Sequence, residues 1–362
     1  MKKIGIFTYM QTNYGAVLQA FALQHFLQIQ GYDAEIVDFT TKEHLVDHKV
    51  FKKYPTKWWK SFLLNGLSLV WYLPLRRREK RNLQFKKDYY HFTRRYSDQE
   101  ELLKDPPQKD VYISGSDQVF NLNSPYYQVY YLNFDKKGAK KIAYAPSFGI
   151  SAFSEKMEAT IRPLLNDFDA LSCRETQGAE FISRIVGQVV PTVVDPVLLL
   201  SREEWSSVAK HNNDEYILVY DLNGGDNLIC IANSIKQQMG MPVYCITGNY
   251  LKRYKVDRVI LDAGPAEFVG FFENASYVVT DSFHGTSFSI IFGKPFLTYI
   301  AVKETSGRIT SLLERVGLSN RIINNISEFE EKKIVMRDGT IVNLDELTRE
   351  SKQFIVGAIE EK

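Results

Sequence analysis

The stretch VVTDSFHGTSFSIIFG, residues 278–293, places a histidine among carboxylate and hydroxyl side chains directly after an apolar run. The pattern predicts a strand that turns into a short helix at this point. A helix N-terminus presents unpaired N–H groups and a partial positive charge, which suit a phosphate or a carboxylate. His284 can donate or accept a proton near neutral pH. We therefore predict an anion-binding site here, with His284 as its catalytic acid or base.

The neighbours of His284 are expected to serve the same site. Asp281, three positions earlier, is expected to orient the imidazole or to raise its pKa. Gly285 is expected to let the backbone approach an anion closely. The predicted hydroxyl donors are Ser282, Thr286 and Ser287. The structural alternative is a capped turn whose histidine fills a polar gap.

Two arginines outside this stretch are candidate anion contacts. Arg174 follows a predicted strand in ALSCRETQG. A guanidinium that faces a cleft would bind carboxylate or phosphate through two parallel hydrogen bonds. Arg308, in TSGRITSLLERVG, is the second candidate. In the structural alternatives Arg174 pairs with a nearby acid and Arg308 lies on a helix surface.

Two further segments carry polar residues where a predicted strand ends or a predicted helix begins. ISGSDQVFN follows a strand-like run and offers Ser116, Asp117 and Gln118 to sugar hydroxyls. TNYGA leads into a predicted helix, with Asn13 and Tyr14 as ligand candidates. Asn13 could equally serve only as the helix cap.

The spacing of histidines and cysteines predicts no metal site. His44 and His48 lie four residues apart but have no clear third ligand nearby. Cys173, Cys230 and Cys245 lie far apart and form no C-x-x-C pair. Scattered cysteines in an odd, low number are typical of proteins in a reducing compartment.

Length and composition predict a globular protein of two domains. The chain has 362 residues, of which 44% are hydrophobic and 24% charged. The N-terminal MKKIGIFTYMQTN turns polar after the length of one strand, so we expect no secretory signal. The longest apolar stretch, residues 61–75, is shorter than the roughly 18 residues that a transmembrane helix needs. We predict a cytoplasmic protein.

Positive charge is concentrated in one segment. Residues 51–96 contain 13 lysines and arginines against two acids, in a chain whose net charge is +2. The same segment contains Trp58, Trp59 and Trp71. This combination predicts peripheral contact with the inner face of an anionic membrane, or with an anionic substrate, and nucleic acid is not the expected partner. The structural alternative is a helical insertion whose basic residues are merely solvated.

The order of strand and helix patterns predicts an α/β fold. KIGIFTY, AVLQAFALQHFLQIQ and AEIVDF read as strand, helix and strand, and a second such series starts at EYILVYDL. We predict an N-terminal Rossmann-like domain over residues 1–200, with a basic aromatic insertion at about 45–100. A C-terminal Rossmann-like domain over 201–340 would carry the DSFHG motif, and an amphipathic helix would follow over 341–362. Two such domains would face each other across a cleft.

Six segments together resemble the polysaccharide pyruvyl transferases. They are KIGIFTYMQTNYGAVLQAFALQHFL, ISGSDQVFN, KIAYAPSFG, SCRETQG, VVDPVLLL and VVTDSFHGTSFSIIFGKPF. The resemblance implies a fold like that of the GT-B glycosyltransferases. It also implies transfer of the pyruvyl group of phosphoenolpyruvate onto a sugar as a ketal, in cell-surface or exopolysaccharide biosynthesis. Phosphoenolpyruvate would be the donor substrate, no cofactor would be needed, and the basic segment suggests a lipid-linked saccharide acceptor.

The chain departs from the family pattern at one position of the histidine motif. Family members often carry an arginine two residues before the histidine, where this chain has Ser282. Donor binding would then depend on Arg174, Arg308, Lys294 or the helix dipole. Two alternatives stay open: a GT-B glycosyltransferase that uses a nucleotide sugar, with Glu267 at the ribose, and a non-catalytic glycan-binding relative.

Overall fold

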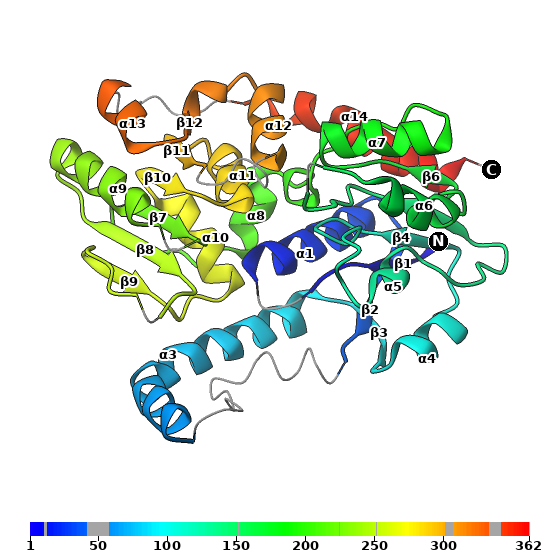
Figure 1. Ribbon diagram of the computed structural model, residues 1–362, viewed down its shortest axis with the longest axis horizontal. Coiled ribbons are helices and arrows are strands. Elements are labelled where there is room, and N and C mark those ends of the chain that lie inside the picture. The colour runs from blue at the N-terminus through cyan, green and yellow to red at the C-terminus, as the bar shows by residue number, and fades with distance from the viewer. Residues whose placement is uncertain are drawn as a thin grey trace.

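The computed structural model describes residues 1–10, 13–41, 58–150, 152–223, 225–250, 252–300, 307–332 and 342–361, without the side chains of 58–71 and 330–332. His44 and His48, and the side chains of Trp58, Trp59 and Trp71, therefore lie outside the described residues. Figure 1 shows two α/β halves side by side, each built around one sheet. We call these the first sheet and the second sheet.

The first sheet has six strands in the order β3-β2-β1-β4-β5-β6, and all neighbouring strands are parallel. Its strands are β1 (Lys3–Phe7), β2 (Asp33–Phe39), β3 (Phe92–Tyr96), β4 (Val111–Ser114), β5 (Lys140–Ala143) and β6 (Ala170–Leu171). The helices that connect or follow them are α1 (Tyr14–Ile29), α3 (Trp58–Tyr89), α4 (Gln99–Lys104), α5 (Tyr127–Tyr130), α6 (Glu155–Leu165) and α7 (Thr176–Val186). The central strands are apolar runs buried on both faces, as parallel sheets require.

The second sheet also has six parallel strands, in the order β12-β11-β10-β7-β8-β9. Its strands are β7 (Ile217–Asp221), β8 (Val243–Thr247), β9 (Arg258–Ile260), β10 (Tyr277–Thr280), β11 (Phe296–Tyr299) and β12 (Ile322–Ile323). Its helices are α8 (Arg202–Val208), α9 (Asp226–Met239), α10 (Pro265–Asn274), α11 (Phe283–Ile291), α12 (Gly307–Arg315) and α13 (Ile326–Lys332). The short helix η1 (Pro196–Leu198) precedes α8, and the short helix η3 (Ser319–Arg321) precedes β12.

Both sheets have the strand order of a Rossmann fold. The order reverses between β1 and β4 in the first sheet, and between β7 and β10 in the second. Ligands of such folds bind outside the carboxyl ends of the strands at this point of reversal. The fold is therefore two Rossmann-like units of the GT-B type, and its two reversal points are the places to look for a site.

Helix α1 joins the two halves. It lies between the sheets in Figure 1, and it packs against η1 and α10 as well as β2. Most of its residues are buried, which explains why the segment 11–30 contains no charged side chain. One hydrophobic cluster accordingly runs from Ile4 and Ile113 of the first sheet through Leu18 to Leu218 and Val278 of the second.

The last helix, α14 (Leu344–Glu360), returns to the first sheet. Lys140 at the start of β5 donates from Nζ to the carbonyl oxygen of Ala358 at 2.8 Å. Lys2 forms an ion pair with Glu360 at 3.0 Å, and the Ser351 hydroxyl accepts a hydrogen bond from the Val194 N–H. The C-terminal helix thus covers the first sheet although the chain reaches it from the second.

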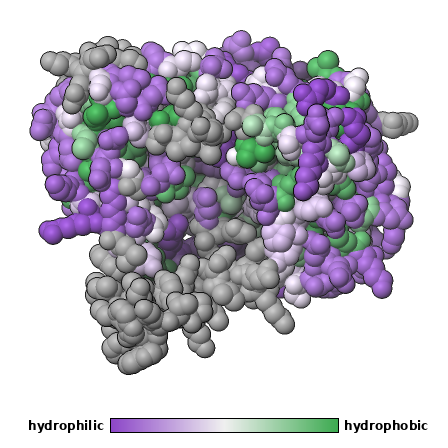
Figure 2. Space-filling model, in the orientation of Figure 1, coloured by the Kyte–Doolittle hydropathy of each residue, from purple (hydrophilic) through white to green (hydrophobic). Residues whose placement is uncertain are grey.

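No helix in the described part of the chain combines the length and apolarity that crossing a membrane requires. The face seen in Figure 2 is mainly hydrophilic, with apolar residues in small, separated groups. We propose residue 200, between η1 and α8, as the boundary between the N-terminal and C-terminal domains.

Candidate active site

His284 lies where the reversal points of the two sheets meet. It is the second residue of α11, which begins after β10, and it is buried. A β-carbon built on Gly15, the second residue of α1 after β1, would lie 2.1 Å from His284 Nδ1. The imidazole therefore packs edge-on against the backbone of the first half. Its other nitrogen, Nε2, lies 3.8 Å from Oδ2 of Asp195.

A buried ion pair supports the Nε2 side of the ring. Arg174 donates from Nη1 to Oδ2 of Asp195, and the Ser116 hydroxyl donates to the same oxygen at 2.9 Å. The Val197 N–H donates to Oδ1 of Asp195 at 3.1 Å. Burial alone would raise the pKa of Asp195, but Arg174 and His284 outweigh it, so that the pKa of Asp195 lies below its ordinary value. Asp195 is therefore an anion at neutral pH.

More carboxylates lie near Arg174 than it forms hydrogen bonds with. Its Nη2 lies 3.6 Å from Asp117 and its Nε lies 3.8 Å from Glu175. Neither nitrogen makes a hydrogen bond within the described part of the chain, and both are buried. The guanidinium also lies over the Phe283 ring at 4.8 Å. Two N–H-bearing nitrogens of a fixed guanidinium fork are thus left to bind an anion.

Arg308, in the first turn of α12, brings a second cation to Arg174. Burial and the like charge of Arg174 lower the pKa of Arg308, while Asp117, Glu175 and Asp195 oppose this. Both arginines, Phe283 and Asp195 line one small cavity between the halves. The space open to the centre of a water-sized sphere is about 10 Å³, which is room for about one water molecule. Binding of a larger anion therefore requires side chains that line this cavity to move.

Burial sets the protonation state of His284. Desolvation is the largest effect on its pKa and lowers it, and the charges of Arg174 and Arg308 act in the same direction. Asp195 and Asp117 raise the pKa but do not offset the burial. The pKa of His284 therefore lies below its ordinary value, and the ring is neutral near pH 7.

Asp117 is held in an unusual backbone conformation. Its φ is 70°, in the left-handed region that residues other than glycine rarely adopt. Its carbonyl oxygen accepts hydrogen bonds from the N–H groups of Val119 and Ser147, both at 2.8 Å, which fixes this turn after β4. The neighbouring Gln118 packs its side chain against Gly149. Of the ISGSDQVFN residues, Ser116 and Asp117 therefore adjoin the histidine site through Arg174.

The expectation that Asp281 orients His284 is wrong. The Asp281 carboxylate instead accepts hydrogen bonds from the N–H groups of Leu222 and Asn223, at 2.9 and 3.0 Å. It closes the turn after β7. The carboxylate beside the imidazole belongs to Asp195, on the first half.

The hydroxyls of the histidine motif are used inside the protein. Ser282 caps α11 by accepting from the Gly285 N–H, and Ser287 donates to the Phe283 carbonyl. Thr286 donates to the Ser282 carbonyl and contacts the Thr298 hydroxyl of β11 at 2.8 Å. All three are buried. The expected ligand donors are thus structural in this conformation.

Gly285 also has a different role from the expected one. A β-carbon there would lie 2.3 Å from Oγ1 of Thr280, so the glycine allows α11 to pack on β10 rather than allowing an anion to approach. Lys294, considered for donor binding, follows the opposite end of α11. Its charged neighbours are Arg202 and Glu273.

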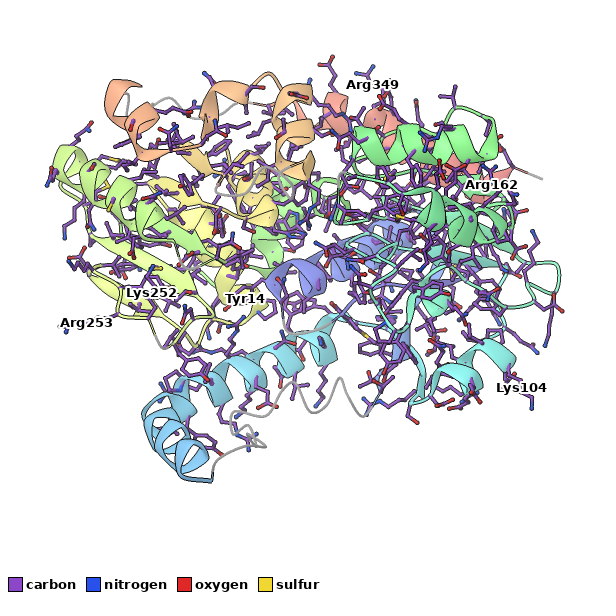
Figure 3. The ribbon with its side chains drawn as sticks, in the orientation of Figure 1. Tyr14, Lys104, Arg162, Lys252, Arg253 and Arg349 are labelled. Atoms are coloured by element: carbon purple, nitrogen blue, oxygen red, sulfur yellow. The ribbon has the colours of Figure 1, made fainter. Side chains whose placement is uncertain are left out.

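Asn13 and Tyr14 serve the packing of α1. Asn13 is exposed and caps the helix by accepting from the Gly15 N–H at 3.0 Å. Tyr14 is buried, donates its hydroxyl to the Ala263 carbonyl at 2.8 Å and stacks on Phe268 at 4.5 Å. Figure 3 shows Tyr14 at the end of α1 that faces the second half. These contacts fix α1 against α10.

Sequence reasoning missed Asp195 as a site residue. The signal was present in VVDPVLLL, where a carboxylate follows an apolar run and precedes a proline. Pro196 begins η1, and Asp195 caps it through the Val197 N–H. We found no metal-binding group of three or more His, Cys, Asp or Glu residues among those described.

Comparison with known proteins gives one family match and several matches of fold. The model of a family described as polysaccharide pyruvyl transferase matches residues 13–303. No curated protein sequence matches the chain.

The fold matches include UDP-N-acetylglucosamine 2-epimerases from three organisms. The Rickettsia bellii structure has a TM-score of 0.52 at 12% identity, covering 99% of this chain and 96% of that one. The Neisseria meningitidis structure, bound to UDP-GlcNAc, has a TM-score of 0.52 at 9% identity and covers 99% of both chains. The Methanocaldococcus jannaschii structure, in complex with UDP-GlcNAc and UDP, has a TM-score of 0.52 at 15% identity and covers 98% of both chains. At these identities the likeness concerns the fold alone.

Proposed function

The chain belongs to the polysaccharide pyruvyl transferase family, and from that premise we propose that it transfers the pyruvyl group of phosphoenolpyruvate to a saccharide. Two hydroxyls of the saccharide would form a cyclic ketal, and phosphate would be released. The observation that carries this proposal is the pair Arg174 and Arg308, two cations that line one cavity next to a neutral histidine.

The two arginines fit a small anion with several negative charges. The carboxylates of Asp195, Asp117 and Glu175 partly offset the repulsion between the two cations. Arg174 keeps Nε and Nη2 without hydrogen bonds, and Arg308 approaches from α12. Phosphate and carboxylate are the groups that a guanidinium fork binds best. Arg174 and Arg308 would thus replace the arginine that the family often carries at the position of Ser282.

The proposed reaction conserves atoms and protons. One saccharide hydroxyl adds its oxygen to the carbon that carries the phosphate ester, and the methylene carbon of the donor gains a proton to become a methyl group. A second hydroxyl then adds to the same carbon, and the bond to the phosphate oxygen breaks. Of the two protons that the hydroxyls lose, one is matched by the proton that the new methyl group gains, and the other leaves with the phosphate.

His284 is the proposed general base for the attacking hydroxyl. A neutral imidazole can accept a proton, and such transfer contributes about 10²–10⁴ in rate. The ion that forms would be stabilised by Asp195, whose charge raises the pKa of His284. With Nδ1 against Gly15, Nε2 is the nitrogen that we assign to the proton transfer.

We propose that the reaction takes place in the cytoplasm and serves cell-surface or exopolysaccharide biosynthesis. The acceptor is proposed to be lipid-linked, because the basic segment 51–96 would bring the protein to the inner face of the membrane. The donor is a substrate, so no cofactor is required.

The alternative donor is a nucleotide sugar, which the epimerase structures of similar fold carry. In this chain Glu267, the candidate for the ribose, caps α10 and pairs with Arg81 at 3.2 Å. These observations favour phosphoenolpyruvate over a nucleotide sugar.

Calorimetric titration of the full chain tests the donor directly. We expect phosphoenolpyruvate to bind and UDP-sugars to give no heat of binding. Binding of UDP-sugars alone would assign the chain to the nucleotide-sugar alternative. Binding of a saccharide without either donor would point to the glycan-binding relative.

A further inference from the structure

One face of α3 is exposed along its second half. The exposed residues recur every three or four positions, which is the spacing of a single helix face. They are Leu73, Arg76, Arg77, Lys80, Leu83, Gln84, Lys87 and Asp88. We call this set the outer stripe. Leu73 and Leu83 are 62% and 60% exposed, so the stripe combines apolar and cationic groups.

The opposite face of α3 is fixed to the body of the protein. Arg81 pairs with Asp262 at 3.1 Å and with Glu267 at 3.2 Å, both on the second half. Phe85 is buried and packs against Phe21 of α1 at 5.5 Å. These contacts prevent the helix from rotating, so the outer stripe lies on the face of α3 opposite Arg81 and Phe85.

Arg78 and Lys86 strengthen this attachment at the junction of the halves. The Arg78 guanidinium lies over the Tyr14 ring at 4.6 Å. Lys86 donates to the carbonyl oxygen of Met10, and burial lowers its pKa to about 8. The helix is thus held by residues from both halves, close to the start of α1.

The outer stripe has a strong excess of positive charge. The stripe contains four cations, Arg76, Arg77, Lys80 and Lys87, and one exposed acid, Asp88. A nearby acid of intermediate exposure, Glu79, pairs with Arg76 at 3.2 Å. Each cation close to an anionic bilayer strengthens binding by about fivefold. Charge complementarity therefore points to an anionic surface as the partner.

The sequence of the preceding turns favours a bilayer over a nucleic acid. Residues 58–75 contain one charged residue, Lys60, together with three tryptophans and many leucines. The backbone of this part is helical, and in Figure 1 it extends beyond the body at the lower edge of the molecule. Tryptophan, leucine, arginine and lysine are residue types that helices in a membrane interface contain.

We propose that α3 lies in the plane of an anionic phospholipid bilayer and binds it through the outer stripe. The lipid headgroups contact the arginines and lysines, while the leucines enter the interface. The proposal rests on the proposed function in one respect, since a lipid-linked acceptor gives the enzyme a reason to bind the bilayer. Because α3 is fixed to both halves, the bilayer also sets the direction that the site faces.

Co-sedimentation of the full chain with vesicles tests this proposal. One vesicle contains phosphatidylcholine alone, and the other contains phosphatidylcholine and phosphatidylglycerol at a ratio of about 7:3. The test variant combines Arg76→Gln, Arg77→Gln, Lys80→Gln and Lys87→Gln. The matched control removes four exposed cations elsewhere, through Lys156→Gln, Arg184→Gln, Arg253→Gln and Arg349→Gln. Figure 3 shows Arg349 at the edge of the molecule opposite α3.

We expect the wild type and the control to bind anionic vesicles at least tenfold more strongly than neutral ones. The stripe variant is expected to lose most of that preference. Equal loss in the control, retention in the stripe variant, or preferential binding of the wild type to RNA would overturn the proposal. Titration of the stripe variant with phosphoenolpyruvate separates the two ideas, since donor binding is expected to be unchanged whatever happens with vesicles.

Discussion

Gly15 and His284 are in contact across the junction of the two sheets, and a β-carbon on Gly15 would lie 2.1 Å from His284 Nδ1. Any other residue at position 15 would displace the ring. The glycine is required for steric reasons, because the His284 side chain occupies the space that a β-carbon would fill. Its backbone conformation is an ordinary helical one and does not itself require glycine. A residue that touches no proposed substrate thus sets the position of the proposed base.

Substitution of this glycine should therefore damage catalysis. In Gly15→Ala the imidazole must move by about 1 Å, and a displacement of that size can cost about 100-fold in kcat. Steady-state kinetics with phosphoenolpyruvate and a saccharide acceptor measure the effect. The control is Gly357→Ala in α14, where the added methyl group meets no atom within 4 Å. Equal activity of the two variants would show that the ring does not depend on Gly15.

Removal of the imidazole should affect the chemical step more than the donor. We expect His284→Ala to lower kcat by about 10²–10⁴. Phosphoenolpyruvate should still bind within about threefold of the wild type, because the arginines remain. Calorimetry and kinetics on the same preparation give both quantities. A variant with normal kcat would exclude His284 as the base.

The pH profile should report the lowered pKa of His284. A base works only when neutral, so kcat/KM should fall as the pH drops through that pKa, at an acid limb below about pH 6.5. The Asp195 charge raises the pKa of His284, so Asp195→Asn should move the limb to still lower pH.

The control for the pH profile is Asp281→Asn. That carboxylate closes the turn at Leu222 and Asn223 and is not among the charges that act on the ring. The acid limb of the Asp281→Asn pH profile should coincide with that of the wild type. A shift in Asp281→Asn but not in Asp195→Asn would reverse the assignment of the two carboxylates. Circular dichroism at each pH confirms that the variants are folded.

Arg308 and Arg174 should share the binding of the donor. Loss of a charged hydrogen bond costs about 1.5–3 kcal/mol, so Arg308→Ala should weaken phosphoenolpyruvate by about 10–150-fold. For Arg174 we prefer Arg174→Lys, since it keeps a cation beside Asp195 and removes only the fork. Arg184→Ala, on an exposed surface pair with Glu158, is the control that should bind normally. Normal affinity in both test variants would contradict the proposed donor site.

Thr286 should matter for stability but not for the donor. Thr286→Val keeps the shape and removes the hydroxyl that bonds to the Ser282 carbonyl and contacts Thr298. We expect a loss of about 1–3 kcal/mol in the free energy of unfolding. Urea denaturation and calorimetry would measure the two effects. Weaker donor binding at unchanged stability would restore Thr286 as a ligand.

The sequence predicted the fold well because its signals are local. KIGIFTY and EYILVYDL are apolar runs of strand length, and Ser201 with Glu204 forms the capping box that the pattern SREEW predicted. The spacing of apolar residues from Leu344 likewise predicted α14, although not that it would return to the first sheet. Such a return depends on contacts between distant segments.

The site was harder to predict, for the same reason. Arg174 and His284 were both singled out, and the structure brings them to one ion-pair network through Asp195. Asp281 was the natural partner for His284 because it is close in sequence. A helix that begins between the two residues turns their side chains in different directions, and the carboxylate comes instead from Asp195, directly before η1. The hydroxyls of Thr286 and Ser287 could be read as donors only while their acceptors within α11 were unknown.

The return of α14 to the first sheet affects how the chain can be completed during synthesis. The ribosome makes the strands of the first sheet early, but Lys2 and Lys140 meet their partners in α14 only after the whole second sheet has been made. During that interval the surface that α14 covers stays open to solvent. The described strands of the second sheet are all made before α14. We therefore expect the half that is begun first to be the half that is finished last.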